Sequence, residues 1–425
     1  RLGSVVFPGR VAGTQLSGKK ALIPRNLVSI EHRETMQKSL DQKLARILAD
    51  PACRDFVLAD AKDADMAFGL AAPGKSPEHY ADEAQFRTLD EYRQLMREIV
   101  AQGLVDILLM SASTNEVLNI QQRLFDASHV TPAVRANDTT DIWLASGTGR
   151  YGSQPSLPFR TATIDHIMCG KLDCDPAERR LGADLGLYSV TFNNDAELDH
   201  RSLEAYKAFR LEAEGKGFRH FLEVFDPNAP GDHAPGNLPR FINDHIVRAL
   251  AGVTSRGRPL FLKIPYHGPA AMEALAGYDR SLIVGILGGS SGTTFDAFHM
   301  LWEAKKYGAR VALYGRKINH SEHQLTFIKY LRALADDEIE PAEAVRAYHG
   351  DLGKLGIQAY RPLDEDLRQT KTATGYSGRT TSAARAKPEA QSPVLRKPGD
   401  EPDFSRMTPT EKAQWNLERW KRILG

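Results

Sequence analysis

Lys263 lies inside a short run of apolar residues, which is an unusual place for a charged side chain. The run reads PLFLKIP over residues 259–265. A charged lysine without a partner is unfavourable there, and burial lowers the pKa of an ammonium group. A neutral amine is the nucleophile that forms a Schiff base with a carbonyl compound. The position therefore favours imine chemistry at Lys263; the alternative is a lysine at a strand end that is paired with a carboxylate.

Two glycine-containing turns follow the seventh and eighth apolar runs of the chain. The first turn contains Gly288, Gly289 and Ser290, and the second contains Gly315 and Arg316. Such turns let backbone N–H groups approach a phosphate closely, and a guanidinium can bind two oxygens of one anion. Many loops need glycine for other reasons, but two such turns together predict a phosphate site.

Further charged side chains stand at or near the ends of apolar runs. Glu223, in the run HFLEVF, is a candidate general acid or base, and the alternative is a structural ion pair with Lys263. Asp60 and Lys62 belong to the charged stretch ADAKDAD, which follows the first run. That stretch is either a solvated loop or part of a substrate clamp, with Asp60 handling protons and Lys62 binding substrate.

Polar residues also interrupt the third and fourth runs. Arg135 and Asn137 close the third run, and Ser189 and Thr191 lie on the fourth. Residues of this kind are more often satisfied members of a barrel layer than catalysts. We nevertheless expect Arg135 to contribute to substrate binding.

Histidines give little sign of a metal centre. His320 and His323 are three residues apart near the start of an expected helix. No third ligand stands in register with them, whereas a catalytic zinc site needs three protein ligands. We therefore predict no metal and no cofactor.

The chain alternates between short apolar runs and amphipathic helical stretches. Eight runs have the Val, Ile, Leu and Phe content of strands that are buried on both faces: FVLAD (56–60), VDILLM (105–110), TPAVRAN (131–137), LGLYSVTF (185–192), HFLEVF (220–225), PLFLKIP (259–265), LIVGILGG (282–289) and RVALYG (310–315). Helical spacing falls between them, at residues 88–102, 201–216, 238–252, 268–278 and 294–307. Alternation of this kind predicts parallel strands with right-handed crossovers. An open doubly wound sheet would fit, but polar residues at the ends of many runs favour an α/β protein of the (β/α)8, or TIM, barrel type.

Segments outside this alternation divide the chain. We expect an N-terminal arm over residues 1–30 and a barrel over 31–365, with an insertion at 138–184 between the third and fourth strands. Residues 366–425 read as an extended or disordered tail that ends in a short helix with Trp415 and Trp420. Two indoles on a short helix predict burial against protein, and we expect a homo-oligomer.

Composition narrows the possible partners. The 425 residues carry 55 Lys and Arg against 54 Asp and Glu, a formal net charge of +1. A balance so close to zero argues against nucleic acid or an anionic membrane as the main partner. No apolar run approaches the length of a membrane-spanning helix, and no signal peptide is expected. Three cysteines are too few for a secreted disulfide framework, which favours reduced thiols and a cytoplasmic location.

Several of these motifs, in their order along the chain, resemble class I, Schiff-base aldolases of the superfamily that includes DeoC and the fructose- and tagatose-bisphosphate aldolases. The matching parts are LADAKDADMAFG, FLEVF, FLKIPY, ILGGSSG and GARVALYGRKIN, within residues 55–335. The resemblance implies that Lys263 forms an imine with a ketose. It also implies that Asp60 and Glu223 handle protons.

The resemblance assigns the substrate phosphate to the two glycine turns. Gly289, Ser290, Gly315 and Arg316 would hold it. The expected substrate is a sugar or sugar phosphate, and no metal is required. Two alternatives remain: a transaldolase- or thiolase-like transferase on the same barrel, and a non-catalytic barrel with a role in assembly.

Overall fold

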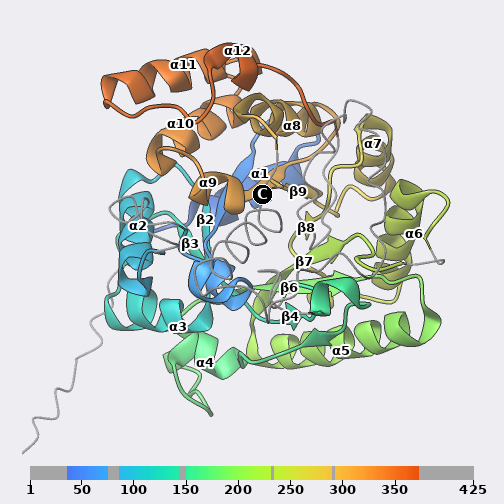
Figure 1. Ribbon diagram of the computed structural model, residues 1–425. Coiled ribbons are helices and arrows are strands. Elements are labelled where there is room, and N and C mark those ends of the chain that lie inside the picture. The colour runs from blue at the N-terminus through green and yellow to red at the C-terminus, as the bar shows by residue number, and fades with distance from the viewer. Residues whose placement is uncertain (1–35, 75–85, 143–149, 231–233, 290–291, 373–425) are drawn as a thin grey trace, which may run out of the picture. The chain divides into compact units, whose positions relative to one another are not determined.

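The computed structural model describes residues 36–74, 86–142, 150–230, 234–289 and 292–372 (Figure 1). The N-terminal arm, Ser290 and the helix with Trp415 and Trp420 lie outside these residues. Contact grouping separates residues 1–378 from residues 379–425, and the description below concerns the first unit.

Eight parallel strands form one sheet, and each coincides with a predicted apolar run. In chain order they are β1 (Val57–Ala61), β2 (Ile107–Met110), β3 (Thr131–Arg135), β6 (Leu185–Thr191), β7 (Arg219–Phe225), β8 (Leu262–Lys263), β9 (Gly285–Leu287) and β10 (Val311–Tyr314). Neighbours along the sheet are β8, β7, β6, β3, β2, β1, β10 and β9. The two ends meet, because Ile264 bridges Ile286 and its N–H donates to the Gly285 carbonyl at 3.0 Å. The predicted (β/α)8 barrel is confirmed, and the open doubly wound sheet is excluded.

Helices surround the sheet, as Figure 1 shows. The α-helices are α1 (Ser39–Ala49), α2 (Leu89–Gln102), α3 (Ala112–Asn115), α4 (Ile164–Cys169), α5 (Ala196–Lys216), α6 (Leu238–Ala251), α7 (Pro269–Tyr278), α8 (Thr294–Lys306), α9 (Arg316–Asn319), α10 (Gln324–Ala335), α11 (Pro341–Lys354) and α12 (Leu363–Asp366). Short turns complete the set: the π-helical η3 (Glu116–Gln121) and the 3-10 helices η1 (Ala64–Met66), η2 (Gly69–Ala71), η4 (Tyr151–Ser153), η5 (Glu178–Arg180) and η7 (Ser255–Gly257). None of the helices in the described ranges is both long and apolar enough to cross a bilayer.

The two faces of the strands contribute to separate cores. Inward-facing residues, such as Leu187, Phe221 and Phe261, fill the interior of the barrel together with Leu40 and Leu44 of α1. Helix α1 therefore closes the amino-terminal end of the barrel. Its predicted apolar stripe explains this, because leucines four residues apart lie on one face of a helix. The opposite, carboxyl-terminal end is left for a site.

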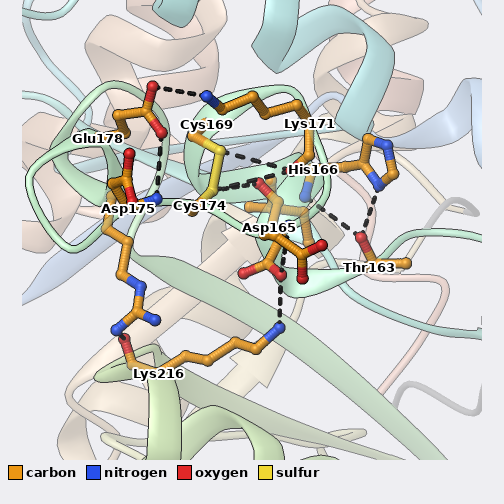
Figure 2. The surroundings of a disulfide bond; sticks show 12 residues. Thr163, Asp165, His166, Cys169, Lys171, Cys174, Asp175, Glu178 and Lys216 are labelled. Atoms are coloured by element: carbon orange, nitrogen blue, oxygen red, sulfur yellow. Dashed lines mark hydrogen bonds and ion pairs between the residues drawn. A yellow bond between two sulfur atoms is a disulfide. The ribbon is translucent and has the colours of Figure 1, made fainter.

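The insertion between β3 and β6 contains regular structure. Strands β4 (Asp138–Thr139) and β5 (Pro158–Phe159) pair antiparallel, and α4 follows as the helix that leads toward the fourth barrel strand. Cys169, the last residue of α4, forms a disulfide with Cys174, while Cys53 is free. Figure 2 shows this disulfide beside the ion pair of Asp165 with Lys216 (2.8 Å).

The prediction of reduced thiols is wrong for the Cys169–Cys174 pair. The cysteines are five residues apart, and the turn that ends α4 brings their Cα atoms to 6.1 Å, within the range that a disulfide spans. Scarcity of cysteine argues against a framework of several bridges, but it does not exclude one local bridge. The cytoplasmic location loses the support of reduced thiols and stays a prediction.

Candidate active site

Three neighbouring strands present one polar residue each to the interior of the barrel. Ser189 on β6 is in register with Glu223 on β7, which is in register with Lys263 on β8. All three side chains are buried. Lys263 Nζ lies 2.6 Å from Glu223 Oε1, and Ser189 Oγ donates to Glu223 Oε2 at 2.7 Å. The lysine predicted from its apolar run and the carboxylate predicted as its partner are therefore in direct contact.

Arg135, at the end of β3, extends this row of charges. Its Nη1 donates to Ser189 Oγ at 3.1 Å, and its Nη2 lies 3.5 Å from Glu223 Oε2. Its Nε donates to Asp63 Oδ2 at 2.6 Å. Burial acts to lower the pKa of Arg135, but the negative charges of Asp63 and then Glu223 outweigh burial and raise it. Arg135 is therefore a fixed cation between two carboxylates.

Asn137 holds β3 and β6 together just beyond the end of β3. Its Nδ2 donates to the Ser189 carbonyl at 2.8 Å, and its Oδ1 accepts from the Ser189 N–H at 2.6 Å. The side-chain amide thus takes the place of a backbone pair in the ladder. This contact fixes Ser189, which in turn contacts both Glu223 and Arg135.

A cavity of about 80 Å³ lies above this row, at the carboxyl-terminal end of the barrel. The residues around it are Ala61, Asp63, Ala64, Ala67, Phe68, Arg135, Ile142, Glu223, Phe225, Lys263, Leu287, Gly288, Gly289, Leu313, Gly315 and Arg316. Its apolar members come largely from one cluster in which Phe68, Ala67 and Ile142 pack with Phe225 and Leu287. The cavity therefore combines a charged floor with an apolar cover, an arrangement that strengthens electrostatic interactions with a bound substrate.

The two glycine turns reach the same cavity. Gly288, Gly289 and Gly315 line it, and so does Arg316, whose guanidinium carbon lies 5.8 Å from the centre of the Phe68 ring. A Cβ at Gly315 would lie 2.7 Å from the carbonyl oxygen of Ala61, so the close approach of the last strand to the first requires glycine. Ser290, predicted as part of this set, lies outside the described residues.

The charges around the cavity favour an anion. Its cations are Lys263, Arg135 and Arg316, and its carboxylates are Asp63 and Glu223. Only Arg316 among the cations stands on the side of the glycine turns. A negatively charged group would therefore be best placed near Arg316, with the remainder of the molecule extending toward Lys263.

Asp60 and Lys62 do not reach this cavity, which corrects the prediction that they handle protons and bind substrate. Asp60 is in register with Leu108 and Tyr314, which belong to the core between strands and helices. Lys62 Nζ lies 3.2 Å from Asp60 Oδ2 and donates to Gln324 Oε1 at 2.8 Å. Burial raises the pKa of Asp60 to about 6 and lowers that of Lys62. The pair is a buried ion pair outside the barrel interior.

Asp63 is the carboxylate from the first strand that does line the cavity. The sequence shows it within the same charged stretch, three residues after Asp60, but nothing in that stretch says which carboxylate points inward. Phe68 and Ile142, which cover the cavity, carry no sequence signal of such a role. In the described part of the chain, no three His, Cys, Asp or Glu residues are grouped as metal ligands would be.

Comparison with known proteins yields structural similarity and no sequence family. No family model matches the chain, and no curated protein matches it. An archaeal fructose 1,6-bisphosphate aldolase is 15% identical, with a TM-score of 0.49 over 70% of this chain and 98% of that one. A Schiff-base-forming fructose-1,6-bisphosphate aldolase is 17% identical, with a TM-score of 0.48 over 71% of this chain and 100% of that one.

A third solved structure is that of a Corynebacterium glutamicum (Brevibacterium flavum) protein, 16% identical, with a TM-score of 0.47 over 72% of this chain and 100% of that one. The resemblance to Schiff-base aldolase barrels that the sequence motifs indicate is thus found among solved structures as well. At this level of identity it concerns the barrel fold, and the roles of individual residues depend on the geometry of the cavity.

Proposed function

We propose that the protein is a class I aldolase, a lyase that cleaves or forms a C–C bond of a phosphorylated ketose through an imine on Lys263, without a metal. The observation that supports this most directly is a lysine amine buried beside an enclosed cavity, 2.6 Å from the carboxylate of Glu223. A carboxylate at that distance can accept the ammonium proton. The amine is then neutral and nucleophilic.

Imine formation can proceed with Glu223 as the one proton carrier. Glu223 takes a proton from Lys263, and the amine attacks the ketone carbon to give a carbinolamine. The same carboxyl group returns its proton to the carbinolamine hydroxyl, which leaves as water, and an iminium ion remains. Ser189 and Arg135 contact the second oxygen of Glu223 and so stabilise its charged form.

Cleavage follows the same proton path. Glu223, again a carboxylate, accepts the proton of the C4 hydroxyl, and the electrons of the C3–C4 bond move into the iminium, which acts as the electron sink. The aldehyde half departs and an enamine remains. Protonation at C3 and addition of water release the second product and restore Lys263. The phosphate, held by Arg316 and the glycine turns, contributes positioning.

Reductive trapping tests this proposal. Sodium borohydride with dihydroxyacetone phosphate should inactivate the protein and add the mass of the reduced ketose to a peptide that contains Lys263, with EDTA present throughout. Lys263→Met should abolish trapping. Lys317→Met is the matched control, because Lys317 is also largely buried and its pKa is lowered to about 8, yet it does not line the cavity. Trapping at Lys317, or none at all, would contradict the proposal.

A transaldolase would use the same lysine, and the buried Lys263–Glu223 pair favours it equally. The two activities differ in the fate of the enamine. An aldolase releases it after protonation, whereas a transferase holds it until an acceptor aldehyde arrives. Release of free dihydroxyacetone phosphate from the ketose bisphosphate, with no acceptor added, would support the aldolase.

A further inference from the structure

A second concave site lies at the amino-terminal end of the barrel, opposite the cavity of Lys263. Its lining comes from the segments that lead into β1 and β10 and from the ends of α8 and α10, and consists of Arg54, Trp302, Lys305, Lys306, Arg310 and Asp337. The groove has a volume of about 380 Å³, in the range of sites for small molecules. Four of its six side chains are cations and one is a carboxylate.

The single carboxylate is shared by two of the cations. Lys305 Nζ lies 2.8 Å from Asp337 Oδ2, and Arg54 Nη2 lies 2.9 Å from the same oxygen. Lys305 also donates to the carbonyl of Ala335 at 2.6 Å, so it completes the carboxyl end of α10. These contacts account for Lys305 as a structural residue, but one carboxylate does not balance two cations.

Arg310 and Lys306 have no carboxylate partner among the described residues. Arg310 uses Nη1 for the carbonyls of Ala309 (2.9 Å) and Lys305 (3.3 Å), which leaves Nε and Nη2 directed to other partners. Burial lowers the pKa of Arg310, and the neighbouring positive charge of Arg54 acts in the same direction. A half-buried guanidinium beside a second one is a place where an anion would relieve repulsion.

Trp302 adds an aromatic surface to these charges. Its ring lies 5.4 Å from Lys306 Nζ, a cation–π contact that holds the lysine at the groove. The nearby Asp336 does not neutralise the groove, because it pairs with Arg332. An aromatic ring next to unpaired cations matches a molecule that joins a planar ring to several negative charges.

We propose that this groove binds a nucleoside diphosphate, with the base against Trp302 and the phosphates on Arg54, Lys306 and Arg310. The nearly neutral chain does not attract anions as a whole, so the attraction is local to this groove. Because it lies at the opposite end of the strands from Lys263, the bound nucleotide is not a substrate of the aldolase reaction. It would act as an effector ligand.

Calorimetric titration of the full-length protein with ADP tests the proposal. ADP should bind with one site per chain, more tightly than adenosine, and its affinity should fall as salt screens the charges. Lys306→Gln and Arg310→Gln should each weaken ADP roughly tenfold, the loss of one charge-assisted contact. Trp302→Leu should also weaken ADP and should remove its advantage over pyrophosphate.

Two variants serve as controls. Arg201→Gln removes an exposed arginine of α5 that pairs with Glu197, far from the groove along the chain, and Lys263→Met removes the proposed imine lysine. Both should bind ADP as the wild type does, so the result does not depend on the aldolase proposal. Absence of ADP binding, unchanged affinity in Lys306→Gln and Arg310→Gln, or loss of binding in Lys263→Met would overturn the proposal.

Discussion

At the scale of residues, the chemistry of the cavity depends on one proton shared between Lys263 and Glu223. Their 2.6 Å contact lies within a row of charges in which each group has an opposite neighbour, from Lys263 through Glu223 and Arg135 to Asp63. Such a row holds every member in one geometry, which is a requirement for proton transfer. Arg316 stands apart from the row, on the side of the glycine turns, and its contribution can be tested separately.

Arg316→Ala should weaken a phosphorylated substrate and leave an unphosphorylated analogue nearly unaffected. Loss of one charge-assisted contact corresponds to about 1.5–3 kcal/mol, which is a ten- to a hundredfold loss in kcat/KM. Steady-state kinetics with fructose 1,6-bisphosphate and with fructose would compare the two. Equal losses on both substrates would show that Arg316 holds the barrel end together and does not bind phosphate.

Asp60→Asn should change how stability depends on pH. The pKa of Asp60 is raised from 3.8 to about 6, so the native state binds its proton more tightly than the unfolded state does. Its contribution is therefore present below pH 4 and is lost as pH rises toward 6, by about 3 kcal/mol at 1.36 kcal/mol per unit of pKa.

The measurement is the free energy of urea unfolding between about pH 4 and pH 6. Wild type should lose stability across this window more steeply than Asp60→Asn. The exposed Asp364, paired with Arg368 on the surface, supplies the control substitution Asp364→Asn, which should keep the wild-type slope. Identical slopes in wild type and Asp60→Asn would mean that Asp60 is ionised in the native state across the whole window.

At the scale of elements, the sequence predicted all eight strands but could not predict which way their side chains face. Every residue of β1 is buried, so the alternation that marks a half-exposed strand is absent. For this reason Asp60 was assigned to the cavity, although Asp63 is the residue that lines it. Lys263 and Glu223 were predicted correctly to meet, because a charged residue inside an apolar run needs a partner wherever it points.

The glycine turns illustrate a contact between elements that sequence can indicate only by residue type. Gly315→Ala would place a Cβ 2.7 Å from the Ala61 carbonyl oxygen of the neighbouring β1. Backbone cannot yield as a flexible side chain does, so we expect a loss of about 1–3 kcal/mol in stability. Displacement of Arg316 should raise KM for the phosphorylated substrate as well.

A glycine without such a neighbour provides the control. Gly353 lies in α11, and a Cβ built on it meets nothing within 4 Å. Gly353→Ala should therefore leave stability unchanged or raise it by about 0.5–1 kcal/mol, since alanine favours helix. Urea unfolding of both variants would separate a general effect of removing glycine from the contact with β1; a Gly315→Ala protein as stable as wild type would refute that contact.

At the scale of the whole molecule, the barrel is complete well before the chain ends. The eighth strand ends at Tyr314, and helices α10 to α12 follow it. The chain is then held by Asp296 near the start of α8, whose carboxylate accepts from the backbone N–H groups of Thr370 (2.8 Å) and Lys371 (3.0 Å). Contact grouping places a boundary after Gly378.

A chain that ends at Gly378 should therefore keep the barrel and its chemistry. We expect the same urea midpoint and the same borohydride trapping as in the full chain, because every contact described for the cavity lies within residues 61–316. We expect the mass measured by light scattering to fall, because we assign the proposed contact between subunits to the removed helix with Trp415 and Trp420. A lower midpoint would show that the barrel depends on the removed residues. An unchanged mass would instead place the contact between subunits elsewhere, or show that none exists, and the two indoles would then need another burial site.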